Sequence, residues 1–262
     1  MLDMTTGPDV FSSTTTVRFA ASTPGASTFI DAITAAVHSV TLNGVALDPA
    51  EVSDGVRIQL PNVEAENILV VEADGRYMHT GEGLHRFVDP ADGEVYLYTQ
   101  FEVPDSRRMF AVFEQPDLKA AFRFTVTAPS HWQVVSNQPT PVPEPVEGST
   151  GSPSTSSGGD KATWAFGPTP PRISSYITAL IAGPPYDVVR DELTSSDGRV
   201  IPLGVFSRKS LSQYLDADYI FEKTKQASPT SSRSSASPTR STSTTSSSCP
   251  STTRVRWRTR AR

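Results

Sequence analysis

Apolar and polar residues alternate over short segments through the first 206 residues of the chain. The segments are rich in β-branched and aromatic residues and are separated by turn-forming residues, a pattern typical of β-strands. Their spacing predicts a mainly β domain, built as a saddle-like β-sandwich. The segments with this pattern are residues 14–20, 39–44, 56–60, 67–73, 95–102, 121–128, 131–137 and 176–183.

One long segment interrupts this pattern. Residues 139–160 are first rich in proline and then rich in serine and glycine. Such a composition cannot bury enough apolar surface to order itself. We therefore predict a mobile hairpin loop here rather than a linker between domains. The strands on either side, residues 131–137 and 162–166, are expected to pair across the loop.

The pattern changes after residue 210. Residues 211–226 contain helix-forming residues, no glycine or proline, and apolar side chains spaced roughly as on one face of a helix. We predict that this helix begins a second domain. Residues 227–262 are dominated by serine, threonine and arginine and have neither a helical nor a strand period, so their composition predicts a disordered tail.

The amino-acid composition indicates which class of protein the chain belongs to. The chain has 262 residues, of which 37% are hydrophobic, and a mean hydropathy of -0.28, values that suit a globular protein with a buried core. No run approaches the roughly 18 apolar residues of a membrane-spanning helix. The N-terminus lacks the basic and apolar regions of a signal peptide, so we expect a cytoplasmic protein with no membrane partner. The single cysteine, Cys249, excludes a disulfide framework and a zinc site with several cysteines.

Charge is distributed unevenly along the chain. Residues 227–262 contain seven arginines and no acidic residue, which leaves 16 basic against 28 acidic side chains in residues 1–226. An acidic body repels nucleic acid, and the arginines lack the spaced aromatic residues of a surface that binds single strands. The charge pattern therefore argues against a nucleic-acid partner.

A small cluster of titratable residues lies in the segment YMHTGEGLHRF, which contains His79, Glu82 and His85. A zinc peptidase places two histidines four residues apart on one face of a helix, with a glutamate beside the first. Here the histidines are six residues apart, and the two glycines between them oppose a helix. We interpret both as structural loop histidines. His38 and His131, in strand-like segments without an acidic or cysteine neighbour in the sequence, are also interpreted as structural.

The strand predicted at residues 95–102 contains the candidate binding residues. Strand alternation places Gln100 and Glu102 on one face. An amide oxygen and a carboxylate on one face form an acceptor pair suited to an ammonium group. Spacing alone favours a simpler interpretation, a solvated strand face. Arg107 and Arg108 follow, and we interpret them as partners for nearby acids in a structural turn.

Three stretches together resemble a known family. The segments TQFE, RRMFAVFEQPDLKA and ISSYITALIAG have the order and spacing found in the N-terminal domain of the aminopeptidase N family of zinc metallopeptidases, of the actinobacterial type. The resemblance covers nearly all of residues 1–226. It implies a β-saddle domain at residues 1–190 and the beginning of a thermolysin-like α+β catalytic domain at residues 191–226.

The resemblance also implies roles for the two candidate residues. The TQ-x-E segment of the family contributes substrate contacts to the active site, and Gln100 and Glu102 match its positions. Glu102 is expected to help hold the free α-ammonium group of a peptide substrate, and Gln100 to line the same pocket. This implication outweighs the solvated strand face as the interpretation of these residues.

Other features of the family are missing from the sequence. The sequence lacks the exopeptidase motif G-A-M-E-N of the family, whose glutamate also binds the α-ammonium group. It also lacks the zinc motif H-E-x-x-H. Zinc is the cofactor of the full-length family, but no zinc ligand can be named here. We therefore expect an N-terminal fragment that binds no zinc and is inactive alone. The alternative is a stand-alone β-sandwich binding module with a Ser/Thr-rich tail.

The arginine-rich end has an interpretation in another reading frame. RVRWRTRA can be encoded by CGG GTG CGA TGG AGA ACG CGG GC, which regrouped by one base reads G-A-M-E-N-A-G. We therefore predict that residues 227–262 are a frameshifted tail, produced by the loss of one base near codon 227. Sequencing the gene tests this prediction, because the frame one base away should continue into H-E-x-x-H.

Overall fold

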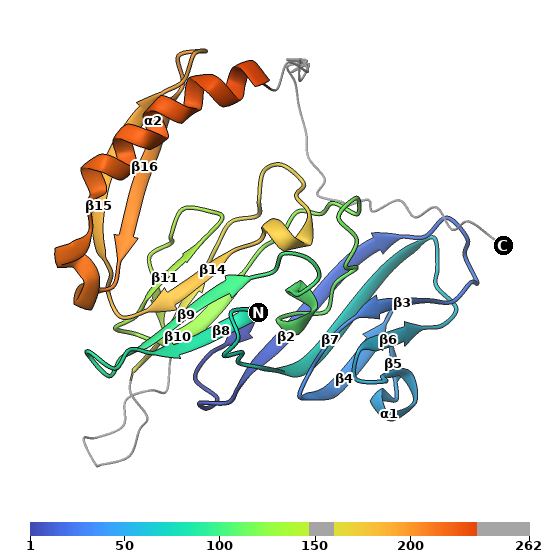
Figure 1. Ribbon diagram of the computed structural model, residues 1–262. Coiled ribbons are helices and arrows are strands. Elements are labelled where there is room, and N and C mark those ends of the chain that lie inside the picture. The colour runs from blue at the N-terminus through green and yellow to red at the C-terminus, as the bar shows by residue number, and fades with distance from the viewer. Residues whose placement is uncertain (147–159, 235–262) are drawn as a thin grey trace. The chain divides into compact units, whose positions relative to one another are not determined.

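The computed structural model describes residues 1–146 and 160–234 (Figure 1). The chain forms two compact units, of which the first runs from Met1 to Pro184 and the second begins at Pro185. Neither proline can donate a hydrogen bond to a β-ladder, and the strand before them ends at Gly183. The boundary between the two units lies at this Pro-Pro pair, and the division into a β-saddle domain and the beginning of a catalytic domain stays a prediction.

An eight-stranded sheet forms the largest part of the first unit. Its order is β12-β13-β10-β1-β2-β7-β4-β5, with antiparallel neighbours except for the parallel pair of β1 and β10. In the longest pair, β2 and β7 match from Val10 opposite Arg76 to Ala20 opposite Glu66. The strands are Leu2–Asp3 (β1), Val10–Ala20 (β2), Ala36–Leu42 (β4), Val45–Leu47 (β5), Glu66–Arg76 (β7), Thr125–Pro129 (β10), Glu144–Pro145 (β12) and Lys161–Ala165 (β13).

Two smaller sheets complete the first unit. A four-stranded sheet has the order β11-β14-β9-β8, and a two-stranded sheet pairs β3 with β6. Their strands are Gly83–Val88 (β8), Val95–Gln100 (β9), Gln133–Ser136 (β11), Leu180–Gly183 (β14), Thr28–Asp31 (β3) and Arg57–Leu60 (β6). Three short helical turns lie between strands, at Pro49–Val52 (α1), Ser106–Arg108 (η1) and Ser175–Ile177 (η2).

Strand alternation determines which side chains enter the core. In β7, Leu69, Val71 and Ala73 are buried and the residues between them are more exposed, as the period of a strand requires. Gly75 continues the buried row, opposite Phe11 of β2. One hydrophobic cluster lies between the eight-stranded and four-stranded sheets, and another lies between the eight-stranded sheet and the β3–β6 pair. The predicted mainly β fold with packed sheets is confirmed.

The pairing expected around residues 139–160 is wrong. β11 pairs with β14 in the four-stranded sheet, whereas β13 pairs with β10 in the eight-stranded sheet. The strands on either side of the segment therefore belong to different sheets. The segment also contains β12, which pairs with β13. Residues 147–159 lie outside the described residues, and the mobility of the loop stays a prediction.

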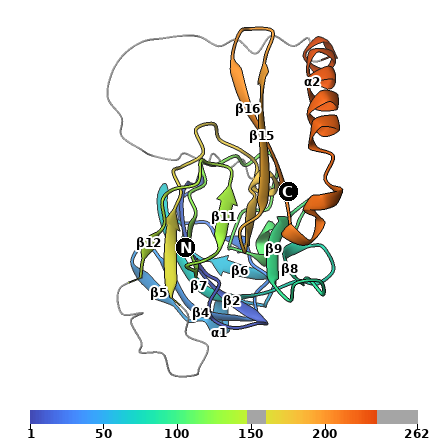
Figure 2. The ribbon, with the colours of Figure 1, turned by 90° about the vertical axis from the view of Figure 1, so that its left-hand side faces the viewer.

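The second unit contains a hairpin and a helix. β15 (Asp187–Thr194) and β16 (Val200–Ser207) pair antiparallel along their whole length, and the turn η3 (Lys209–Tyr214) leads into α2 (Ala217–Ser234) (Figure 2). Lys225 Nζ on α2 lies 2.6 Å from Asp191 Oδ2 on β15. This hydrogen bond is the main reason that the pKa of Asp191 is lowered, followed by the one from the backbone of Glu192.

The helix predicted at residues 211–226 is present but shifted along the chain. Residues up to Tyr214 form a 3₁₀ turn, and α2 then continues through residues 227–234, which we expected to be part of the tail. Residues 235–262 lie outside the described part of the chain. Their predicted disorder and their frameshifted origin stay predictions.

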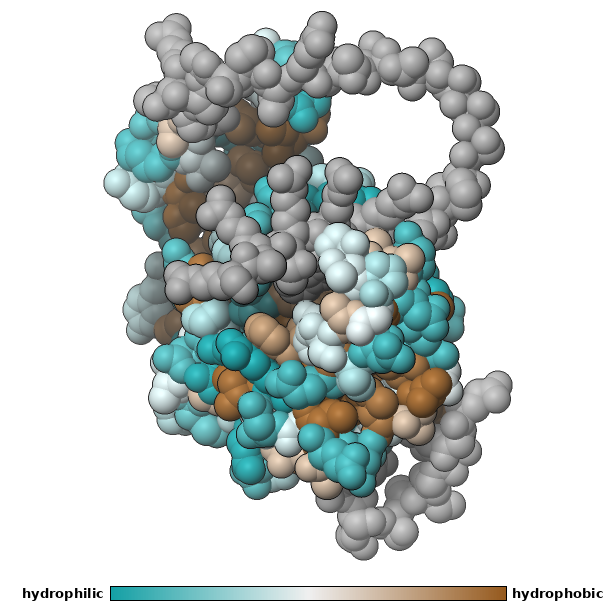
Figure 3. All heavy atoms as spheres, turned by 90° about the vertical axis from the view of Figure 1, so that its right-hand side faces the viewer, coloured by the Kyte–Doolittle hydropathy of each residue, from teal (hydrophilic) through white to brown (hydrophobic). Residues whose placement is uncertain are grey.

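The surface of the first unit is mixed in character. On the face drawn in Figure 3, hydrophilic residues cover most of this unit and hydrophobic residues lie between them in small groups. Scattered apolar residues of this kind are normal on a folded domain. None of the helices in residues 1–146 and 160–234 is long and apolar enough to cross a membrane.

Candidate functional site

The two candidate residues lie at the end of an interior strand. β9 pairs with β8 on one side and with β14 on the other, and its last residue, Gln100, is opposite Gly83 of β8. Gln100 and Glu102 are both exposed. The TQFE segment therefore presents an amide and a carboxylate to solvent at one end of the four-stranded sheet.

A turn, rather than strand alternation, brings these residues together. We expected the strand to continue to Glu102, but it ends at Gln100. Phe101 is only 3% exposed and anchors the chain in the core, while Pro104 cannot extend a ladder. The backbone N–H of Glu102 donates to Oε1 of Gln100 at 3.1 Å. This hydrogen bond couples the Gln100 side chain to the backbone of Glu102.

The side-chain oxygens of Gln100 and Glu102 can accept further hydrogen bonds at this turn. The carboxylate of Glu102 has no hydrogen-bond or ion-pair partner within the described residues, and Oε1 of Gln100 retains a second lone pair. Two other acids in the region are paired with Arg108, which lies 2.6 Å from Asp105 and 3.8 Å from Glu82. Glu102 thus remains available to a cation from outside, and Arg108 has the structural role expected of it.

Close packing fixes the position of the helical turn η1 against β8. Gly83 has φ +59°, and a Cβ added there would lie 3.1 Å from Cβ of Arg108 and 3.2 Å from Cγ of Met78. A side chain at this residue would therefore strain the backbone and push η1 away. The contact holds the segment after Glu102 against the sheet.

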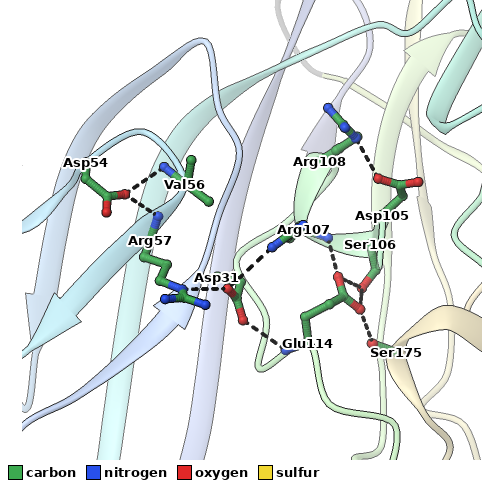
Figure 4. A network of polar contacts seen from close by, with 10 residues as sticks. All are labelled: Asp31, Asp54, Val56, Arg57, Asp105, Ser106, Arg107, Arg108, Glu114 and Ser175. Carbon is green, nitrogen blue, oxygen red and sulfur yellow. Dashed lines mark hydrogen bonds and ion pairs between the residues drawn. The ribbon is translucent and has the colours of Figure 1, made fainter. Parts of the chain in front are cut away.

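A carboxylate below the turn fixes the same segment from inside (Figure 4). Glu114 accepts hydrogen bonds from Oγ of Ser106 at 2.7 Å, from the N–H of Arg107 at 2.8 Å and from Oγ of Ser175 at 2.7 Å. Ser106 is 0% and Ser175 2% exposed. Glu114 therefore joins η1 to η2, a link that was not predicted from the sequence.

A second acid extends this network toward the two-stranded sheet. Asp31 lies 3.3 Å from Nε of Arg57 and 3.7 Å from a guanidinium nitrogen of Arg107, and it accepts from the N–H of Glu114 at 3.4 Å. Asp31 is 7% exposed, so its charge requires these partners. At the far end, hydrogen bonds from the N–H groups of Val56 and Arg57 hold the pKa of Asp54 below its usual value.

The histidines of the YMHTGEGLHRF segment make local contacts. His79 donates from Nδ1 to the carbonyl of Arg86 at 3.0 Å, and His85 accepts at Nδ1 from the N–H of Gly81 at 3.0 Å. His85 lies in strand β8 rather than in a loop, because the strand begins at Gly83 and only Gly81 lies in the bend before it. Desolvation, and secondly the neighbouring His79, lower the pKa of His85.

His38 has a partner that its sequence neighbours do not reveal. Its Nε2 lies 2.8 Å from Oδ2 of Asp74, on the adjacent strand β7. No group of three His, Cys, Asp or Glu side chains within residues 1–146 and 160–234 could hold a metal ion. The described residues therefore do not fit a catalytic zinc, which requires three protein ligands.

Comparisons with known proteins agree with this architecture. Residues 2–177 match the model of the peptidase M1 N-terminal domain. The chain is 52% identical over 228 residues to aminopeptidase N of Streptomyces lividans, covering 86% of this chain and 24% of that protein. It is 32% identical over 169 residues to aminopeptidase N of Acetobacter pasteurianus, covering 63% of this chain and 39% of that protein.

A solved structure shares the fold. The crystal structure of Legionella pneumophila aminopeptidase A in complex with aspartic acid has a TM-score of 0.66 at 17% identity, covering 88% of this chain and 26% of that one. The chain spans about a quarter of the length of the Streptomyces protein and of this structure. The family match, which covers most of the first unit, establishes that the chain belongs to the M1 peptidase family and contains its N-terminal domain.

Proposed function

We propose that this chain provides substrate contacts in a zinc-dependent M1 aminopeptidase, which removes N-terminal residues from peptides. Glu102 binds the α-ammonium group of the peptide, and Gln100 lines the same pocket. The observation that carries this proposal is an exposed carboxylate without a partner in the described residues, on a turn coupled to Gln100. The segment that follows the turn is fixed by Glu114.

The chemistry of an ammonium group matches these two side chains. An ammonium group has a positive charge and three N–H donors. Glu102 offers a negative charge and two acceptor oxygens, and Gln100 offers the remaining lone pair of Oε1. An acylated amino terminus would provide no charge and would leave the carboxylate unpaired on binding, which is costly. The pair therefore favours peptides with a free amino terminus.

Binding and orientation are the functions assigned to this chain. Its described residues do not fit zinc, so no step of peptide-bond hydrolysis is assigned to any of them. Holding the amino terminus at a fixed place limits which peptide bond can reach the catalytic groups of the enzyme. Correct placement of this kind makes a large contribution to catalysis.

The test uses a chimera in which residues 1–226 replace the matching segment of the Streptomyces lividans aminopeptidase N. Glu102→Ala should lower kcat/KM for an aminoacyl p-nitroanilide by roughly 10- to 1,000-fold, equivalent to about 1.4 to 4 kcal/mol. Glu102→Gln keeps the shape and removes the charge, so its kcat/KM should resemble that of the alanine variant. The zinc content of the chimera should not change.

Glu94 provides a matched control. It is exposed and precedes the first residue of the same strand, β9, so Glu94→Gln changes the net charge equally but at the other end. Its kcat/KM should stay within about two-fold of the parent chimera. Parent-like kinetics in both Glu102 variants would contradict the proposal. A slow alanine variant beside a parent-like glutamine variant would mean that Glu102 acts through packing rather than charge.

A further inference from the structure

An open cleft of about 200 Å³ lies in the first unit, away from the TQFE turn. It is formed by the chain between β1 and β2, by the residue after β7, by strands β8 and β9, and by the turn before β11. Gln100 and Glu102 are not among its lining residues, so the cleft is a separate site. The residues that line it are Met4, Thr5, Gly7, Pro8, Tyr77, Arg86, Val95, Leu97 and Trp132.

The base of the cleft is apolar and uncharged. Tyr77 is 6% and Leu97 1% exposed, and half-buried Trp132 packs against the same core. The hydroxyl of Tyr77 lies 3.4 Å from the carbonyl oxygen of Met4, to which it donates. Burial raises the pKa of Tyr77, so the phenol remains neutral at physiological pH. The base can therefore accept an aliphatic or aromatic group, but it provides no charge to orient one.

Among the described residues that line the cleft, Arg86 provides the positive charge. Arg86 lies on β8 directly opposite Leu97 of β9 and is half-buried. Within the described residues, no hydrogen bond or ion pair engages its guanidinium group. The acid Asp3 is engaged with Thr5, since its Oδ1 accepts from the N–H and the hydroxyl of Thr5 at 2.8 and 2.6 Å, and within the described residues no ion pair joins Asp3 to Arg86. The guanidinium is thus free to form a bidentate pair with a carboxylate.

We propose that this cleft binds a small carboxylate with a single apolar group, such as an N-acylated apolar amino acid. The carboxylate pairs with Arg86, and the apolar group lies against Tyr77, Leu97 and Trp132. The cleft is smaller than the roughly 300 to 1,000 Å³ of pockets that enclose drug-sized ligands. A ligand with one apolar group of the size of an amino-acid side chain therefore matches the cleft in size as well as in charge.

The test titrates the full chain with N-acetylphenylalanine and follows its tryptophan fluorescence, to which Trp132 contributes from the cleft. A dissociation constant of about 1 mM is expected, because one ion pair and one ring contribute. N-acetylphenylalaninamide has the same shape without the charge and should bind at least about 10-fold more weakly. Trp132→Phe should abolish the fluorescence change, while equilibrium dialysis still detects binding.

Substitutions of two arginines test whether the ligand binds beside Arg86. Arg86→Gln should weaken N-acetylphenylalanine at least about 10-fold and leave the amide unaffected. Arg18→Gln is the matched control, because Arg18 is an exposed strand residue outside the cleft, and it should bind like the wild type. Circular dichroism confirms that each variant is folded. The proposal would be overturned by equal binding of the acid and the amide or by unchanged binding in Arg86→Gln. It would also be overturned if the wild type showed no binding at about 20 mM N-acetylphenylalanine.

Discussion

Removing the carboxylate of Glu114 should strongly destabilise the first unit. The side chain accepts from two hydroxyls and one backbone N–H, at 2.7 to 2.8 Å. The hydroxyls belong to Ser106 and Ser175, which are 0% and 2% exposed. Glu114→Ala leaves these donors buried with no acceptor. An unsatisfied buried polar group costs about 1 to 3 kcal/mol, so we expect a loss of about 3 to 5 kcal/mol in the free energy of unfolding.

A second variant separates the charge from the hydrogen bonds. Glu114→Gln keeps one acceptor oxygen, which can still bond to the N–H of Arg107, and its amide can donate to a serine hydroxyl that rotates to accept. The expected loss is about 1 to 2 kcal/mol. Glu94→Ala removes an exposed carboxylate and should change the free energy of unfolding by less than about 0.5 kcal/mol.

The assay is urea unfolding at 25 °C and neutral pH. Tryptophan fluorescence reports on the first unit, because Trp164 is 2% exposed and lies in its core and Trp132 packs against the same core. The transition midpoint should fall in the order wild type, Glu114→Gln, Glu114→Ala, with little change in the slope m. If Glu114→Ala unfolds within about 0.5 kcal/mol of the wild type, the network does not fix the segment after Glu102.

Two further predictions concern the interior and pH. Gly75→Ala places a Cβ 2.2 Å from Cζ of the buried Phe11 and should cost about 1 to 3 kcal/mol in urea unfolding, whereas Gly167→Ala, with nothing within 4 Å, should be nearly neutral. NMR titration should place the pKa of His85 below its usual value, since desolvation and then His79 lower it. Because the unfolded chain then binds this proton more readily, stability should fall as pH drops from about 6.5 towards the lowered pKa; stability that rises over this range would contradict the assignment.

The strands were predicted well from the sequence, because the alternation of apolar and polar residues depends only on burial along a single strand. In β7, the alternation that was visible in the sequence is the alternation that fills the core. The end of β9 was harder to predict, since Glu102 continues the pattern of the strand. A core contact of Phe101 and the chemistry of Pro104 end the strand first.

Long-range partners explain the errors. The expected pairing across residues 139–160 failed because β11 and β13 have other partners in different sheets, which a local pattern cannot show. The Glu114 network was missed for the same reason, since Ser175 is 61 residues away in the sequence. One signal was available: Glu114 directly follows the apolar stretch MFAVF, and a carboxylate next to a core segment requires partners.

The proposed function requires that Glu102 recognises the charge of the α-ammonium group. In the chimera, leucine p-nitroanilide and 4-methylpentanoyl p-nitroanilide differ only in the α-amine, so the ratio of their kcat/KM values measures recognition of that group. Glu102→Gln should lower this ratio at least about 10-fold, because only the substrate with an amine loses a charge-assisted contact. An unchanged ratio, with both substrates slowed equally, would contradict the proposed role of Glu102.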